Sequence, residues 1–317
     1  MGLTIFNVSA VVISFIVSLV LSIALGTDRA SEVIENIYFA MIMGVVPMYC
    51  ISLPMLWAHV RKMPSRIPTR QDFGVKSFIT LIPVAIFLMS MGNYIGVYLN
   101  TVISAIKGEV IENTTIETVS KSPLWLTIIL VIIIGPLVEE FIFRKLMIDK
   151  LSRYGYLSAI LLSSLAFGLF HGNLYQFFYA FFVGILLGYI YVKSGNWLLS
   201  ALMHALVNVY GGILSEKMSE FMLKYASLYE QYAAGTLADT AELSYYAGIT
   251  TLYSYFHIAM MILGGIIFFN AARRKVPIIE DRKKVCIPKG RRASCIFLNT
   301  GSILFILSSL AIFAIQL

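Results

Sequence analysis

The chain has 317 residues, of which 59% are hydrophobic and 13% are charged, with a formal net charge of +7. Soluble domains carry about 25% charged residues, so this composition excludes a soluble globular protein and predicts a multi-pass membrane protein. The sequence has no zinc-finger spacing and no interleaving of aromatic with basic residues, so we expect no nucleic-acid partner.

Apolar stretches long enough to cross the ~30 Å core of a bilayer recur along the whole chain. They predict an all-α, polytopic transmembrane bundle of about eight or nine helices. We expect these helices to form a single membrane domain, residues 1–317. In chain order the stretches are 4–26, 36–60, 77–104, 123–143, 156–171, 174–192, 197–214, 248–271 and 294–316.

Charged residues alternate in sign between these stretches. Nineteen of the 24 Lys and Arg residues lie at 61–76, 144–153, Lys193 and 273–292. The intervening connections hold five basic and 11 acidic residues. By the positive-inside rule the basic connections and the N-terminus are cytoplasmic. We therefore expect a protein of the cell membrane whose basic connections contact anionic lipids.

The long connection from Ser215 to Gly248 is not a simple loop. Apolar and aromatic residues recur in it at helical spacing: Phe221, Met222, Tyr225, Leu228, Tyr229 and Tyr232. This pattern predicts an amphipathic helix that lies in the membrane interface.

The central block, residues 123–214, holds the main concentration of polar groups at membrane depth. An ionisable side chain inside a membrane helix costs at least about 3 kcal/mol, so such residues indicate a functional site. Because they lie in three separate apolar segments, they predict one polar chamber inside the bundle. The polar residues of the block are Glu139, Glu140, Arg144, His171, His204 and Asn208.

Helical spacing predicts how some of these side chains are grouped. Glu140 and Arg144 are four residues apart, so they share a helix face and can form an ion pair, which leaves Glu139 directed about 100° away. His204 and Asn208 are also four apart. Each group also has a simpler explanation. The glutamate side chains could only extend to the membrane interface, and the histidines and Asn208 could only form hydrogen bonds between helices. By residue count, His171 lies nearer the outer end of its helix than the other groups.

Three patterns follow one another on three predicted helices: Glu-Glu-x-x-x-Arg, Phe-x-x-x-His and His-x-x-x-Asn. Together they resemble the signature motifs of the CAAX-protease and bacteriocin-processing (CPBP, or Abi) family of intramembrane proteases. The resemblance covers about Pro123 to Leu214, and outside that block only hydrophobic helices are recognisable.

The resemblance implies an intramembrane protease in which each polar residue has a role. Glu139 would be the general base that activates water, and His171 would polarise the same water molecule. His204 and Asn208 would stabilise the oxyanion of the tetrahedral intermediate. The substrate would be a peptide or protein, membrane-associated or lipidated, cleaved near the cytoplasmic side.

The same resemblance implies that Glu140 and Arg144 hold Glu139 in place. It leaves a metal open, because members of the family have been described both as metalloproteases and as metal-free enzymes. Two imidazoles and one carboxylate match a catalytic zinc set, so Glu139, His171 and His204 are the candidate zinc ligands.

Two alternatives belong to other functional classes. A non-catalytic bacteriocin self-immunity or scaffold protein could keep the same fold while binding a peptide or partner. A proton-coupled transporter could use intramembrane carboxylates and histidines to relay protons. Transporters commonly have inverted repeats, and the sequence has no recognisable internal repeat.

Overall fold

The computed structural model describes residues 2–237, 240–274, 289–291 and 298–316. Every regular element in these residues is a helix, which confirms the all-α prediction. Six helical spans are long and apolar enough to cross a membrane: Ile37–Val60, Val75–Lys107, Leu124–Tyr154, Leu174–Ser194, Trp197–Ala233 and Ala241–Arg273. Three shorter apolar helices are Val11–Leu25, Tyr156–Phe170 and Thr300–Ala314. These segments match the predicted stretches in order, and the chain is a multi-pass membrane protein.

Several spans are built from more than one helical element. Elements η1, η2, η3 and η5 are π-helical, and η4 and η7 are short 3₁₀ turns. In chain order the elements are α1 (Gly2–Leu25), α2 (Thr27–Glu35), α3 (Ile37–Val46), η1 (Pro47–Ser52), α4 (Leu53–Val60), α5 (Val75–Lys107), α6 (Thr114–Lys121), α7 (Leu124–Thr127), η2 (Ile128–Ile134), α8 (Gly135–Glu140), η3 (Phe141–Ile148), α9 (Asp149–Leu151), η4 (Ser152–Tyr154), α10 (Tyr156–Phe170), α11 (Leu174–Ser194), α12 (Trp197–Asn208), η5 (Val209–Leu214), α13 (Ser215–Ala233), α14 (Ala241–Arg273), η7 (Lys289–Arg291) and α16 (Thr300–Gln316).

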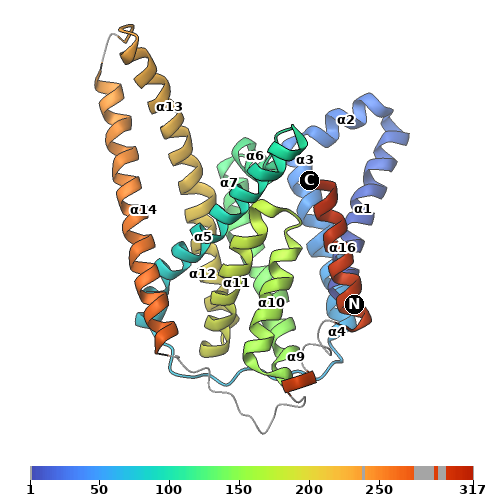
Figure 1. The fold of residues 1–317 in the computed structure, drawn as a ribbon. Helices are drawn as coiled ribbons and strands as arrows, with labels where there is room; N and C mark the ends of the chain where they lie inside the picture. The colour runs from blue at the N-terminus through green and yellow to red at the C-terminus, as the bar shows by residue number, and fades with distance from the viewer. Residues whose placement is uncertain (1, 238–239, 275–288, 292–297, 317) are drawn as a thin grey trace.

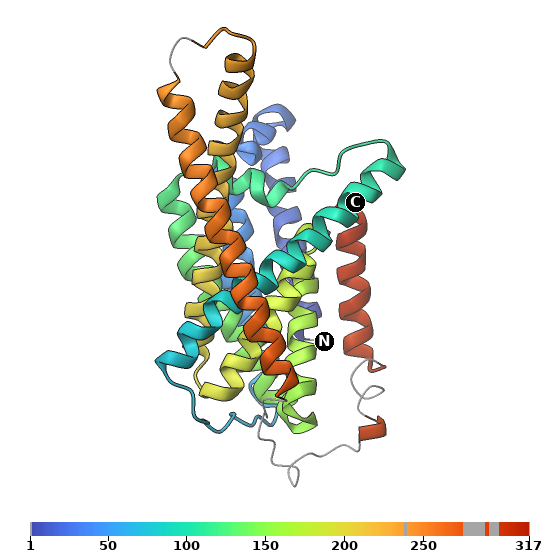
Figure 2. The same ribbon diagram turned by 60° about the vertical axis from the view of Figure 1, so that its left-hand side comes forward.

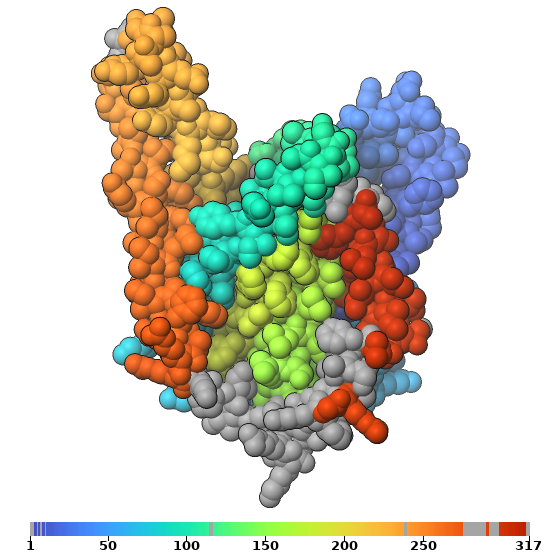
Figure 3. All heavy atoms as spheres, viewed as in Figure 1, coloured from blue at the N-terminus to red at the C-terminus, as the bar shows by residue number. Residues whose placement is uncertain are grey.

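Helices α10, α11 and α12 form the centre of the bundle (Figure 1). The α13–α14 hairpin stands on one side of them, and α1 to α4 stand on the other side together with α16. Helix α5 crosses the central helices diagonally (Figure 2) and packs against both α11 and α14. In the space-filling view the α13–α14 hairpin and the α1–α2 corner stand apart at one end of the molecule, with α5 between them (Figure 3).

The predicted helix after Ser215 is present, but not as a separate interfacial helix. It is α13, which continues α12 and η5 as one span of 37 residues, Trp197–Ala233. It packs lengthwise against α14 instead of lying across the bundle (Figure 1). At 1.5 Å per residue, the 33 residues of α14 reach about 50 Å, which is more than a ~30 Å hydrocarbon core accommodates. The hairpin therefore extends beyond the span of the central helices.

The basic connection between α4 and α5 is tied to the ends of two other spans. The Arg66 N–H donates to the Asp149 carbonyl oxygen at 2.7 Å, and the Gln71 N–H donates to the Lys193 carbonyl oxygen at 2.9 Å. Three of the four basic connections therefore meet at one end of the bundle, as expected of connections on the same side of a membrane. Most of the fourth lies outside the described residues.

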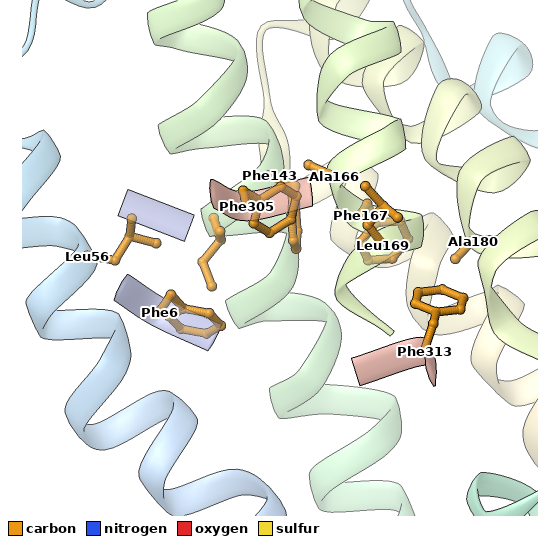
Figure 4. Packing of buried hydrophobic residues seen from close by; sticks show 10 residues of the cluster. Phe6, Leu56, Phe143, Ala166, Phe167, Leu169, Ala180, Phe305 and Phe313 are labelled. Carbon is orange, nitrogen blue, oxygen red and sulfur yellow. The ribbon is translucent and has the colours of Figure 1, made fainter. Parts of the chain in front are cut away.

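A cluster of buried apolar side chains joins both ends of the chain to its centre (Figure 4). The rings of Phe143 in η3 and Phe167 in α10 meet edge to face, with centroids 5.2 Å apart. The buried members of the cluster are Phe6, Leu56, Ile142, Phe143, Ala166, Phe167, Leu169, Ala180, Phe305 and Phe313. Elements from both ends of the chain therefore support the polar residues that the central block carries.

Alanine at Gly264 is expected to destabilise the contact between α5 and α14. A Cβ atom there would overlap the backbone carbonyl of Pro83, which cannot rotate away as a side chain would. Overpacking of this kind costs about 1–3 kcal/mol. The matched control is Gly248→Ala on the same helix, where nothing lies within 4 Å of the added Cβ. Thermal unfolding in detergent should show a lower midpoint for Gly264→Ala alone, and equal midpoints would contradict this packing.

Candidate functional site

Glu139 and Glu140 are the last two residues of α8, which lies between two π-helical segments. The Glu140 side chain is fully buried, and the Glu139 side chain is 16% exposed. Pro136 near the start of α8 has no N–H to donate, so the regular α-helical pattern is interrupted there. π-Helical turns within helices are frequent at functional sites. The site therefore begins on an irregular part of a membrane span.

Glu140 and Arg144 form the ion pair that their spacing predicts. Arg144 Nε lies 2.9 Å from Glu140 Oε2, and both side chains are fully buried. The Nε–H group is not aligned with that oxygen as a hydrogen bond, so the contact is best described as an electrostatic pair. Arg144 also donates from Nη1 to Ser163 Oγ at 3.4 Å. Its guanidinium lies 5.0 Å from the centre of the Phe167 ring.

His204, which lies on α12, contacts Glu140 from a second helix. Its Nδ1 lies 3.1 Å from Glu140 Oε1, so Glu140 bridges Arg144 and His204. A carboxylate only accepts hydrogen bonds, so Nδ1 carries the proton in this contact. The other ring nitrogen, Nε2, lies 3.8 Å from Glu139 Oε2, which is beyond hydrogen-bond range. Glu139 and Glu140 therefore face opposite nitrogens of one imidazole.

His171 directly follows the last residue of α10. Its Nδ1 lies 2.8 Å from the Phe167 carbonyl oxygen. Because a carbonyl cannot donate, Nδ1 carries the proton, and a neutral His171 keeps Nε2 as an acceptor. The next residue, Gly172, has φ of 71°, a left-handed conformation that favours glycine and turns the chain into α11.

The Phe167 ring lies between the two histidines. Its centroid is 4.8 Å from that of His171 and 5.4 Å from that of His204, and both imidazoles meet the ring nearly at right angles. The residue count put His171 near the outer end of its helix, and it does lie at that end. Helix α10 has only 15 residues, so its last turn ends within the bundle beside His204.

Asn208 is the last residue of α12, four residues after His204. Its Nδ2 donates to the Val131 carbonyl oxygen of η2 at 2.9 Å. One N–H of the amide group is used in this contact, and a second N–H remains on the same nitrogen. Asn208 thus joins α12 to the span that carries the two glutamates.

Two tyrosines that the sequence analysis did not select also lie at the site. The Tyr49 hydroxyl, from η1, lies beside the Glu139 carboxylate, within reach of a hydrogen bond. The Tyr179 ring, from α11, lies 6.4 Å from that of His171, and its hydroxyl accepts a hydrogen bond from Gln176 at 2.9 Å. Pro47 and Pro54, which flank Tyr49 within an apolar stretch, were the available signal of an irregular helix there.

The three candidate zinc ligands do not form a metal-binding set in this conformation. Within the described part of the chain, no group of three or more His, Cys, Asp or Glu side chains is arranged to hold a metal ion. Zinc ligands lie about 2.0–2.3 Å from the ion, which requires the ligand atoms to converge closely. We therefore derive no step through a metal ion.

Residues 121–210 match the family model described as Type II CAAX prenyl endopeptidase Rce1-like. The predicted family resemblance is confirmed. The matched residues, called the Rce1-like block below, contain all three motifs and nearly coincide with the block 123–214. A curated relative, UPF0177 protein YxdF of Lactococcus lactis subsp. lactis, is 24% identical over 159 residues, or 48% of this chain and 85% of the relative. No solved structure matches this chain.

Proposed function

We propose that this chain is an intramembrane endopeptidase of the cell membrane, with residues 123–214 as the catalytic core of one membrane domain. One arrangement supports the proposal: Glu139 and His204 face each other at 3.8 Å, and His171 lies across the Phe167 ring from His204. Three spans of the Rce1-like block thus bring a carboxylate and two imidazoles to one place inside a membrane bundle.

Water activation is assigned to Glu139 and His171. The Glu139 carboxylate accepts a proton from a water molecule, and the water oxygen attacks the carbonyl carbon of the scissile peptide bond. His171 accepts from the same water at Nε2, because its Nδ1–H is held by the Phe167 carbonyl. The proton on Glu139 then passes to the leaving amine nitrogen as the C–N bond breaks. General-base catalysis of this kind contributes about 10²–10⁴-fold.

Stabilisation of the oxyanion is assigned to His204 and Asn208. As an imidazolium, His204 donates from Nδ1 to Glu140 and from Nε2 toward the oxyanion. With His204 charged, the two glutamates, Arg144 and His204 carry no net charge together, which lowers the penalty for burying them. Asn208 donates its second N–H to the oxyanion. Its first N–H donates to the Val131 carbonyl oxygen, which holds the amide group in place. Donors held in place before the reaction are often the largest contribution to catalysis.

The substrate class follows from the position of the site within the membrane. A peptide must enter the bundle to reach Glu139, so a membrane-associated or lipidated peptide or protein is the proposed substrate. Cleavage would occur near the predicted cytoplasmic side, with the N-terminus of the chain on that same side. The description of the matched family, a CAAX prenyl endopeptidase, agrees with such a substrate.

Chelation by 1,10-phenanthroline is expected to leave peptide hydrolysis unchanged, because water activation is assigned to side chains alone. Metal analysis of the purified protein, with activity measured before and after chelation, tests this expectation. Activity that is lost on chelation and restored by zinc would overturn it.

A comparison of membrane peptides in cells tests the function as a whole. Cells that express the wild-type protein or Glu139→Gln are compared by mass spectrometry. Peptides that accumulate only with the wild-type protein, and full-length forms that accumulate only with the variant, are expected. Identical peptide sets would favour a non-catalytic protein of the same fold.

A further inference from the structure

Tyr49 lies outside the Rce1-like block, yet it contacts the residue assigned as the base. Its hydroxyl lies beside the Glu139 carboxylate, within reach of a hydrogen bond. Ionised carboxylates only accept, so the tyrosine O–H is the donor when Glu139 is ionised. An independent feature agrees: a Cβ atom built at Gly135 would lie 3.6 Å from Tyr49 Oη and 3.9 Å from Glu139 Oε1. Both oxygens thus lie beside the same glycine.

The segment that carries Tyr49 is irregular and packs against another helix. Tyr49 lies in η1, a π-helical segment that begins at Pro47, and π-helical turns often occur at functional sites. Segment η1 packs against α1, where Ser52 Oγ and Ser9 Oγ are 2.7 Å apart. Ser52 is fully buried. The segment that carries Tyr49 is therefore held in place by a second helix.

The two carboxylate oxygens of Glu139 have different neighbours. Oε1 lies on the side of Gly135 and Tyr49, and Oε2 lies 3.8 Å from His204 Nε2. A hydrogen bond to an ionised acceptor is stronger than one between neutral groups. A donor on one side of the carboxylate therefore restricts rotation of the group and leaves the other oxygen facing the histidine.

We propose that Tyr49 is a positioning residue for hydrolysis: its hydroxyl orients the Glu139 carboxylate so that one oxygen is presented to the attacking water. This inference rests on the proposed function, and it adds a residue from a different part of the chain to the site. Tyr49 touches neither water nor substrate in this role. It acts through Glu139, so its loss should slow turnover without weakening substrate binding.

Infrared difference spectroscopy tests the contact without any substrate. In protein carrying ¹³C-carboxyl glutamate, the Glu139 band is the carboxylate stretch that Glu139→Gln removes. Tyr49→Phe keeps the ring and removes the donor, so this band should shift. Tyr38→Phe, an exposed tyrosine of the same span, should leave the band in place. An unchanged band in Tyr49→Phe would overturn the inference.

Kinetics with an internally quenched, farnesylated peptide ending in Cys-aliphatic-aliphatic-Met tests the consequence. Tyr49→Phe should lower kcat by about tenfold to a hundredfold, the effect of one hydrogen bond to a charged group, with KM unchanged. If Glu139→Gln is inactive while Tyr49→Phe keeps the wild-type kcat, the inference fails and the proposed function stands. If Glu139→Gln is as active as the wild-type protein, the proposed function fails. If the wild-type protein does not cleave the peptide, that substrate is wrong, and the infrared band alone decides the contact.

Discussion

Glu139→Gln is expected to abolish peptide hydrolysis while the protein stays folded. Glutamine has nearly the same shape as glutamate and can still meet Tyr49 and His204, but it cannot accept a proton from water. The loss of a general base lowers the rate by about 10²–10⁴-fold. Turnover of the quenched farnesylated peptide by protein in detergent measures the effect.

Two controls separate lost catalysis from lost structure. The thermal unfolding midpoint of Glu139→Gln should stay well above that of Glu140→Gln, because Glu139 is partly exposed and lies beyond hydrogen-bond range of His204. Glu109→Gln removes an exposed carboxylate that pairs with Lys107, and it should keep full activity. Wild-type activity in Glu139→Gln would end the assignment of this residue as the base.

Glu140→Gln should have the larger effect on stability. The substitution leaves the Arg144 charge without its carboxylate partner at a fully buried position. Breaking a buried ion pair by removing one partner costs about 3–5 kcal/mol. His204 also loses the carboxylate that holds Nδ1, so activity should fall together with stability. Thermal unfolding and expression yield in detergent measure the first effect, and peptide turnover measures the second.

The matched control for this prediction is Glu117→Gln. Glu117 and Lys121 have the same four-residue spacing as Glu140 and Arg144, but their side chains are 46% and 65% exposed. Exposed pairs contribute little, so the unfolding midpoint should not change. The double variant Glu140→Gln with Arg144→Gln should recover part of the stability, because no unpaired charge remains. A loss of activity in Glu140→Gln without any loss of stability would contradict its supporting role.

The sequence predicted those features that are local to one helix. The pairing of Glu140 with Arg144 follows from helical geometry alone, because residues four apart lie on the same face. The order of the apolar segments follows from composition in the same way. The three motifs could be recognised because each one lies within six consecutive residues of one apolar segment.

Contacts between distant segments could not be predicted in this way. The bond from Glu140 to His204 joins residues 64 positions apart, and the contact of Tyr49 with Glu139 joins residues 90 positions apart. No periodicity within either segment indicates its partner. His171 lies at the end of its helix, as the residue count indicated, but the count could not show that this end lies beside His204, because α10 has only 15 residues.

The aromatic cluster has a consequence for how this protein can be studied. Phe6 and Leu56 near one terminus, and Phe305 and Phe313 near the other, complete the apolar surroundings of Phe143 and Phe167. An excised fragment of residues 121–210 would leave those two rings uncovered and would lack Tyr49. Truncation should therefore give an unfolded fragment instead of a minimal enzyme, and variants of the site are best made in the whole 317-residue chain.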